Sequence, residues 1–218
     1  MLDHDSVLRT TVGAVIIAAF ALGTGLTSKA AAQSETQTAL EVSAALSAND
    51  RLAQLGPEGE ALEKRVGTWD VIFTNWEKPG AAPTTTGDLV AEREMIGPML
   101  QERLHTAPGA PGRAWTRIDD LTFNRVTSRW DYMSMDTRAA VGLMPAWSLD
   151  RDPADHIFVS FVPFALAGDG TNVTGQLLQM EQIIIKIDPD HETKDQYFLP
   201  ADGNGTKWLA KRYSYTRK

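Results

Sequence analysis

The stretch "VGTWDVIF", Val66–Phe73, marks the point where a helical pattern gives way to a strand pattern. It follows "EGEALEKR", a run typical of a short helix. From Thr68 onward, Trp69, Val71 and Phe73 alternate with polar residues, which predicts a strand with one buried face. The stretch therefore places the start of a strand directly after a helix.

Short strand patterns continue from this point to the end of the chain, and no long helix lies between them. Turn residues such as Pro79-Gly80, Pro108-Gly109 and Asp188-Pro189-Asp190 separate them. Many short strands in sequence indicate an antiparallel sandwich or barrel. The patterns are "TGDLVAEREMIG", "PMLQERLHT", "AWTRIDDLTF", "TSRWDYMSM", "HIFVSFVPFAL", "GQLLQMEQIIIKI", "DQYFLPA" and "KWLAKRYSYTRK".

The N-terminal region predicts export. Thr10–Leu26 is apolar and uncharged, it is too short for a comfortable membrane span, and Ala30-Ala31-Ala32 fits a cleavage site. We therefore expect a signal peptide over 1–32 and a periplasmic or secreted protein without stable membrane insertion after cleavage. The alternative is an N-terminal helix that anchors the chain to a membrane.

The rest of the chain predicts one domain with a polar lead-in. Residues 33–48 are rich in Ala, Ser, Thr and Gln and predict a flexible segment. Residues 49–218 are expected to form a single β-domain. Its first part offers Asn49 or Asp50 as a helix N-cap, and Gly56-Pro57 predicts two short helices in place of one.

Composition excludes several classes of function. The net charge of −7 argues against nucleic acid as a partner, because nucleic acid binding needs clustered Lys and Arg. The chain has no Cys, which removes thiol catalysis and thiolate metal sites. No pair of His residues has metal-ligand spacing, so we expect neither a metal nor a cofactor.

Two resemblances narrow the fold. Gly67-x-Trp69 after a short helix resembles the signature of lipocalin-type barrels. That resemblance implies an up-and-down barrel of about 8–10 strands, closed at one end by Trp69. A cationic side chain of the last strand would cover the ring in a cation–π contact. The candidates are Lys211, Arg212 and Arg217, and Arg212 is the expected cover.

The second resemblance covers almost the whole chain after 32. "LEKRVGTWDV", "TTTGDLVAEREMIGPMLQERLHT", "FNRVTSRWDYMSMDT" and "KRYSYTRK" are similar to the exported bacterial family named domain of unknown function 1579. That family implies a lipocalin-like barrel and brings no activity or site residue. This chain departs from it at "LTFN", Leu121–Asn124. Its segment Ala140–His156 is interpreted as a loop over a barrel mouth.

Two strand patterns carry charges and aromatic residues on alternating positions. In "WTRIDDL", Trp115, Arg117 and Asp119 share one face. In "SRWDYMSMD", Arg129 and Asp131 share a face, and Tyr132 falls opposite. Either the charges lie in water, or an Arg and an Asp point inward, where burial would shift their pKa values.

The candidate site combines these patterns with two histidines at strand ends. His105 and Asp131 are the candidate acid–base groups, because His titrates near neutrality and a carboxylate can accept a proton. The candidate ligand-binding residues are Arg103, Arg129, Trp115, Tyr132 and His156. The check on this interpretation is whether Arg103, His105, Arg129 and Asp131 point into the barrel.

Three functions stay open on this reasoning. The first is a barrel that binds a small apolar or aromatic molecule in its interior. The second is a lyase, isomerase or hydrolase without a cofactor that uses inward His, Asp and Arg groups. The third is an envelope interaction protein with a filled barrel and an apolar outer patch.

Overall fold

We describe a computed structural model of the chain. It describes residues 47–139, 141–165, 177–202 and 205–218. The predicted signal peptide over 1–32 and nearly all of the predicted lead-in over 33–48 lie outside these residues. None of the helices in the described ranges is long and apolar enough to cross a membrane.

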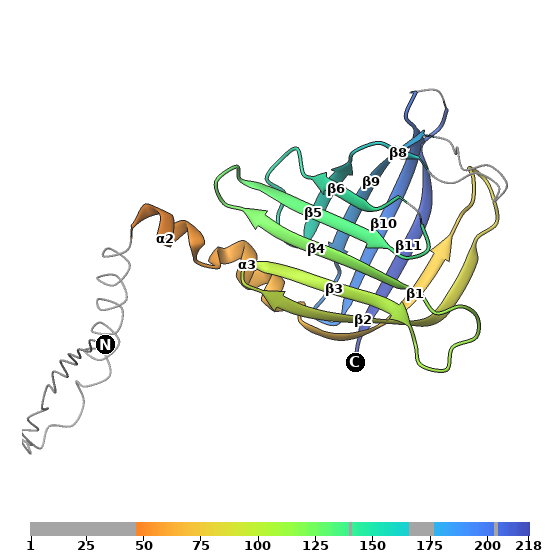
Figure 1. The fold of residues 1–218 in the computed structure, drawn as a ribbon, viewed down its shortest axis with the longest axis horizontal. Helices are drawn as coiled ribbons and strands as arrows, with labels where there is room; N and C mark the ends of the chain where they lie inside the picture. The colour runs from red at the N-terminus through yellow and green to blue at the C-terminus, as the bar shows by residue number, and fades with distance from the viewer. Residues whose placement is uncertain (1–46, 140, 166–176, 203–204) are drawn as a thin grey trace, which may run out of the picture. The chain divides into compact units, whose positions relative to one another are not determined.

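The described chain forms an antiparallel barrel preceded by two short helices, as Figure 1 shows. Ten of its described strands close the ring, because β10 pairs with both β9 and β11, and β8 pairs only with β9. The expected all-β, up-and-down barrel is thereby confirmed. The elements are α2 (Ala48–Ala53), α3 (Gly56–Glu63), β1 (Gly67–Asn75), β2 (Thr84–Ile96), β3 (Met99–Thr106), β4 (Thr116–Asn124), β5 (Arg129–Asp136), β6 (Leu143–Trp147), β7 (His156–Phe161), β8 (Phe164–Ala165), β9 (Leu177–Lys186), β10 (His191–Pro200) and β11 (Trp208–Arg217).

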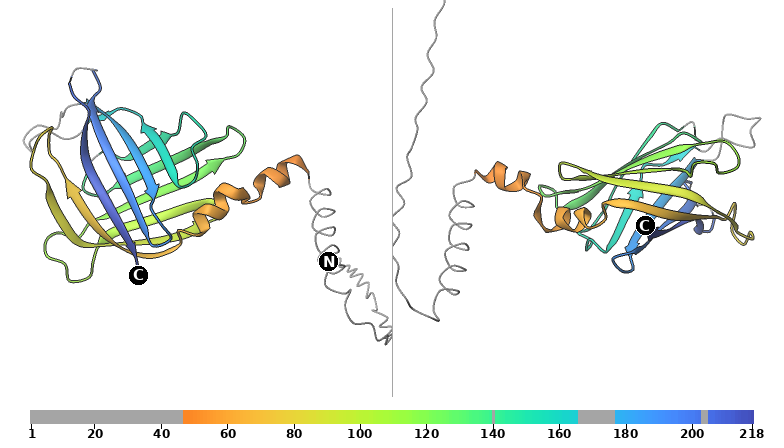
Figure 2. Two further views of the ribbon diagram at one scale, coloured as in Figure 1. Left: turned by 180° about the vertical axis from the view of Figure 1, so that it is seen from behind. Right: turned by 90° about the horizontal axis from the view of Figure 1, so that it is seen from below.

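The two helices separate where the sequence predicts a break. Gly56 adopts a φ of 65°, a conformation that favours glycine, and Pro57 lies in the first turn of α3. The N-cap of α2 is Ser47, two positions before Asn49 and three before Asp50, which were the expected caps, and its hydroxyl accepts from the Asp50 amide. Figure 2 shows α3 at one end of the barrel, where its Leu62 is fully buried.

This end is closed by Trp69, and we call it the plug end. Trp69 is 1% exposed, and its indole nitrogen donates to the Arg65 carbonyl at 3.1 Å. Arg217 covers the ring at 4.3 Å, so the expected cover Arg212 is wrong. Arg212 instead pairs with Asp195 on the neighbouring strand, at 2.6 Å. The other residue of this motif, Gly67, has a φ of 132° and leaves room for the Arg217 guanidinium.

The opposite end of the barrel, which we call the mouth, carries the β1–β2 and β5–β6 connections. Here β5 ends at Asp136, β10 ends at Pro200 and β11 begins at Trp208. The segment predicted as a loop over the mouth differs from that expectation. Leu143–Trp147 is strand β6 of the wall, and the loop after it packs at the plug end, where Trp130 donates to the Asp152 carbonyl. Ala140 lies outside the described residues.

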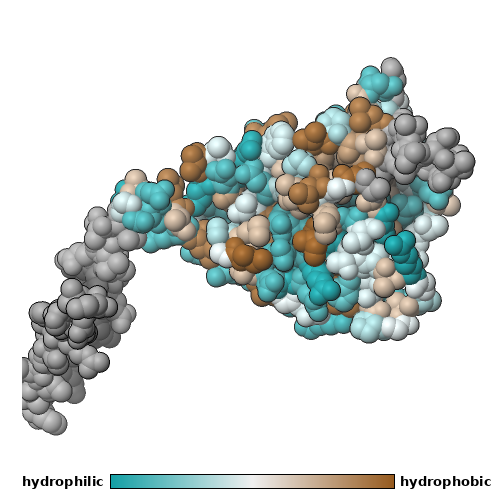
Figure 3. Space-filling model, viewed as in Figure 1, coloured by the Kyte–Doolittle hydropathy of each residue, from teal (hydrophilic) through white to brown (hydrophobic). Residues whose placement is uncertain are grey.

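Alternation along the strands divides the inner from the outer surface. On β5, Trp130, Tyr132 and Ser134 are buried, and the residues between them are more exposed. The apolar interior has two parts, one around Trp130 and Phe123 and one around Trp69 and Tyr215. The outer surface is mixed, and in the view of Figure 3 its apolar residues are scattered among hydrophilic ones.

Candidate functional site

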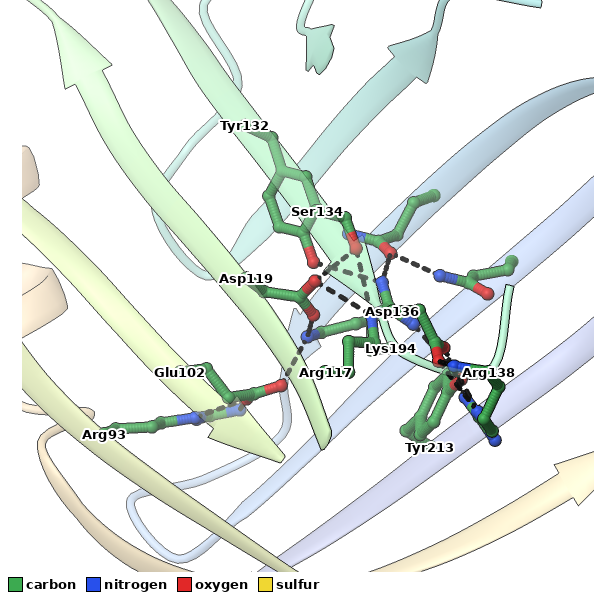
Figure 4. A network of polar contacts seen from close by, with 12 residues as sticks. Arg93, Glu102, Arg117, Asp119, Tyr132, Ser134, Asp136, Arg138, Lys194 and Tyr213 are labelled. Atoms are coloured by element: carbon green, nitrogen blue, oxygen red, sulfur yellow. Dashed lines mark hydrogen bonds and ion pairs between the residues drawn. The ribbon is translucent and has the colours of Figure 1, made fainter. Parts of the chain in front are cut away.

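The interior of the barrel holds a chain of ionised side chains. Three of its contacts join β10 to β2, β3 and β4, with which β10 does not pair, so these contacts cross the inside of the barrel (Figure 4). In order, the chain runs through Arg65, Glu192, Arg93, Glu102, Lys194, Asp119 and Arg117. Every side chain in it is at most 5% exposed.

The centre of the chain is Lys194 of β10. Its amine lies 2.8 Å from a carboxylate oxygen of Glu102 on β3 and 2.8 Å from one of Asp119 on β4. Burial favours the neutral amine, but these two carboxylates outweigh it and hold the pKa of Lys194 well above its ordinary value. Burial also opposes ionisation of both carboxyls, yet Lys194 and Arg93 lower the pKa of Glu102, and Arg117 and Lys194 lower the pKa of Asp119. All three groups are therefore ionised at neutral pH.

Hydroxyl groups complete this centre. Ser134 donates to Asp119 at 2.6 Å, and the Tyr215 hydroxyl donates to Glu102 at 3.0 Å. The Arg117 guanidinium donates to Asp119 at 2.8 Å and to the Tyr213 hydroxyl at 3.1 Å. A cavity adjoins this chain of ionised side chains. The volume that the centre of a water molecule can occupy in it is about 20 Å³, which is room for about one water. The plug half of the barrel is thus filled by its own side chains.

The mouth half has a different pocket. It offers about 30 Å³ on the same measure, and ten described residues line it. Five of them are large apolar side chains from β6, β8, β9, β10 and the β5–β6 turn: Met144, Phe164, Met180, Phe198 and Val141. The others are Arg117, Asp136, Ala139, Gln196 and Lys211.

The charged groups in and beside this pocket differ in whether they have an ion-pair partner. Arg138 and Asp136 form a pair at 2.6 Å, and Arg138 also lies 3.6 Å above the Trp115 ring. Lys211 of β11 makes no ion pair with any described residue, and its amine lies 5.5 Å from the centre of the Phe198 ring. Burial and the neighbouring Arg117 and Arg138 lower the pKa of Lys211, although Tyr213 and Asp136 oppose this.

The four residues on which the sequence-based site depended lie on the outer surface. Arg103 and His105 alternate with the buried Glu102 and Leu104 of β3, and His105 lies 3.8 Å from exposed Glu92. Arg129 and Asp131 pair with each other at 2.8 Å, with a third or more of each side chain exposed. Strand parity places all four away from the interior, so the expected inward site at these residues is wrong.

The remaining predicted site residues are dispersed. Tyr132 points inward, is 4% exposed and receives a hydrogen bond of 3.4 Å from Arg117. Trp115 is partly buried at the mouth under Arg138. His156 is exposed at the start of β7, where its amide donates to the Pro153 carbonyl. The structure brings together only Tyr132 from the predicted set with the interior charges.

The interior charged residues that sequence reasoning left out of the site are Arg65, Arg93, Glu102, Glu192, Lys194 and Lys211. For Arg117 and Asp119 the signal was present, because their alternation with Trp115 was recognised and an inward Arg and Asp was one interpretation. That interpretation holds on β4 and fails on β5. Among the described residues, no group of three or more His, Asp and Glu side chains could hold a metal ion.

Comparisons with known proteins identify neither a family nor a function for this chain. No protein-family model and no curated protein matches the sequence, so the resemblance to domain of unknown function 1579 gains no support. Among solved structures, the chain is similar to EF1p2_mFAP2b bound to DFHBI. The two are 12% identical over 74% of this chain and 99% of that chain, with a TM-score of 0.25. That degree of likeness carries no argument about what this protein binds.

Proposed function

We propose that the protein binds a small, partly apolar molecule at the mouth of its barrel. The observation that carries this proposal is the mouth pocket, in which apolar side chains meet a lysine without an ion-pair partner in the described chain. A concave, mostly apolar site with a few polar groups is the usual form of a small-molecule site. The pocket admits one end of such a molecule, and the rest would extend toward the solvent.

The interior charges favour binding over acid–base catalysis. A general acid at neutral pH needs a raised carboxyl pKa, whereas the pKa values of Glu102 and Asp119 are lowered. Each of the two carboxylates already bonds the Lys194 amine. We therefore propose that the chain of ionised side chains stabilises and shapes the barrel, and that the mouth pocket beside Arg117 binds the ligand.

The test is a titration of ¹⁵N-labelled protein with benzamide and with benzoate, followed by amide shifts. We expect the shifts to concentrate at the Gln196 side chain, the Trp208 indole and the backbone of β11. Met144→Trp would fill the pocket and abolish the shifts. Met135→Trp, on the outer face of neighbouring β5, is the control and would leave them. Shifts confined to the outer face, or no shifts with either compound, would refute the proposal.

We also propose that the protein is exported and belongs to an exported bacterial family of lipocalin-like barrels. The support is the apolar run Thr10–Leu26 followed by three alanines, together with the sequence resemblance described above. Mass spectrometry of the protein recovered from its native cells is expected to show a chain that begins at Gln33. Recovery of the intact Met1 or Leu2 terminus would contradict export by cleavage.

A further inference from the structure

We infer that the mouth pocket takes the carboxylate of a small organic acid, with Lys211 as its ion-pair partner. The inference rests on the proposed function and names the chemical class of the ligand. It depends on the charge pattern inside the barrel, on the apolar lining of the pocket and on the position of Lys211 between them.

The first step concerns pairing. The interior chain contains four cations and three carboxylates: Arg65, Arg93, Lys194 and Arg117 face Glu192, Glu102 and Asp119. Arg138 and Asp136 cancel each other at the mouth. Lys211 adds a further cation without a partner among the described residues. The described interior therefore carries an excess of positive charge in a protein whose net charge is −7.

The second step concerns the field at the pocket. Burial opposes ionisation of the Tyr213 hydroxyl, but Arg117, Lys211 and Arg138 outweigh burial and lower its pKa. These three cations lie at the mouth side of the barrel and give it a positive potential. A negative group entering the pocket would meet this potential and would remove the charge imbalance at Lys211.

The third step concerns the ligand's body. Met144, Met180, Phe164 and Phe198 form the apolar lining, and the Lys211 amine lies over the Phe198 ring. An inorganic anion would leave this lining without contacts. An aryl or alkyl group would bury its apolar surface, which stabilises the complex by about 25 cal/mol per Å² of buried area. The pocket thus fits an anion that carries an apolar group.

The fourth step concerns the number of charges. The Arg117 and Arg138 guanidinium groups already bond Asp119, Tyr213 and Asp136, so Lys211 is the described cation left for a ligand. One ammonium matches a monoanion. A carboxylate fits this requirement better than a phosphate, which carries up to two charges and more acceptor atoms.

The experiment compares two ligands of equal shape. The probes are 4-fluorobenzoate and its neutral isostere 4-fluorobenzamide. Each is titrated into the protein that begins at Gln33, and binding is followed by ¹⁹F NMR. We expect the carboxylate to bind about tenfold more tightly than the amide, because a charged hydrogen bond contributes more than a neutral one. Lys211→Met keeps the apolar stem and is expected to remove this preference.

The control is Lys218→Met, which makes the same change at the plug end, where Lys218 pairs with Asp70 at 2.9 Å. It is expected to keep the tenfold preference. Equal binding of the two probes by the unaltered protein, or a preference that survives Lys211→Met, overturns the inference and leaves the proposed function standing. Failure of both probes to bind at the mouth overturns the proposed function and the inference together.

The pH dependence gives a second readout. Affinity for 4-fluorobenzoate, which is ionised at neutral pH, is expected to be constant from neutral pH up to the pKa of Lys211 and to fall as the pH rises through it. Because that pKa is lowered, the fall begins below the usual lysine range near 10.4. Ionisation of Tyr213 acts in the same direction, while Arg117, Arg138 and Asp136 keep their charges throughout. Binding of 4-fluorobenzamide is expected to change less over this range. An equal fall for both probes would contradict a role for the Lys211 charge.

Discussion

At the scale of single residues, the cation–π contacts around Trp69 show how one side chain closes the barrel. Arg93 lies 4.8 Å and Arg217 lies 4.3 Å from the indole ring, and Arg93 also lies 4.5 Å from the Tyr215 ring. Each such contact contributes about 0.5–2 kcal/mol in addition to the burial of the ring. Trp69 therefore contacts the segment that follows α3, the last strand and one of the interior cations.

Replacing Trp69 tests this role. Trp69→Ala is expected to lower the free energy of unfolding by about 3–5 kcal/mol, because it removes a buried aromatic ring and leaves a cavity. The loss is measured by chemical denaturation, in which the midpoint and slope of the unfolding curve are compared between the variant and the unaltered protein. A loss under about 1 kcal/mol would mean that Trp69 does not hold this end of the barrel together.

Asp119 and Asp131 form a matched pair of carboxylates for a second test. Asp119→Asn leaves Lys194 and Arg117 buried with one negative partner fewer, and we expect a loss of about 3–5 kcal/mol in unfolding free energy. Asp131→Asn breaks an exposed pair and is expected to cost less than about 1 kcal/mol. Denaturant titration of both variants measures the difference. Equal losses would contradict the assignment of the inner and outer faces.

At the scale of elements, the start of β1 depends on a glycine. Gly67 has a φ of 132°, and a Cβ there would lie 3.0 Å from a nitrogen of Arg217. The Arg217 guanidinium also donates to the Lys64 and Val66 carbonyls, at 2.6 and 2.7 Å. The first strand, the end of α3 and the last strand therefore meet at one position that has no side chain.

Gly67→Ala tests this junction. We expect a loss of about 1–3 kcal/mol, because alanine is strained at this φ and its methyl group displaces Arg217 from the Trp69 ring. Thermal unfolding followed at the tryptophan fluorescence measures it. Gly80→Ala is the control, because Gly80 has a φ of 74° but nothing within 4 Å of its added Cβ. A similar loss in both variants would show that strain alone, without the Arg217 contact, accounts for the effect.

At the scale of the whole molecule, the ion chain ties together walls that are far apart in the sheet. Contacts of β10 with β3 and β4, and of β2 with β10, cross the barrel and replace an apolar centre. Such a chain stabilises the fold only while its members are ionised. The free energy of unfolding therefore depends on pH.

The sign of that dependence follows from the lowered pKa values of Asp119, Glu102 and Asp136. Their contribution is fully present above the unfolded-state pKa values, near 4, and is lost as the pH falls through the lower folded-state values. We expect the unfolding free energy to fall steadily from about pH 5 downward. Denaturant titrations between pH 7 and pH 3 measure this. Asp119→Asn is expected to flatten the curve, and an unchanged slope would contradict the role of this carboxylate.

Strand patterns, the helix break and the Gly67-Trp69 signature were readable from the sequence, because each is local. A period of two predicts a strand, and a positive φ needs glycine, whatever the rest of the chain does. The strand patterns left an antiparallel sandwich or barrel open, and the resemblance to the lipocalin-type signature implied the closed barrel with a plugged end. The choice of the covering cation did not, because Arg212 and Arg217 differ only in their side of β11 and in where that strand ends.

Only the tertiary structure decided which charges lie inside. Arg103 and Glu102 are adjacent in sequence, as are Asp131 and Tyr132, and alternation alone says that their faces differ without saying which face is inner. Lys194 lies on β10, which pairs with neither β3 nor β4, and it meets Glu102 and Asp119 of those strands because the barrel closes on itself. Lys211 stands apart for the same reason, since its lack of a partner in the described chain depends on what the opposite wall presents to it.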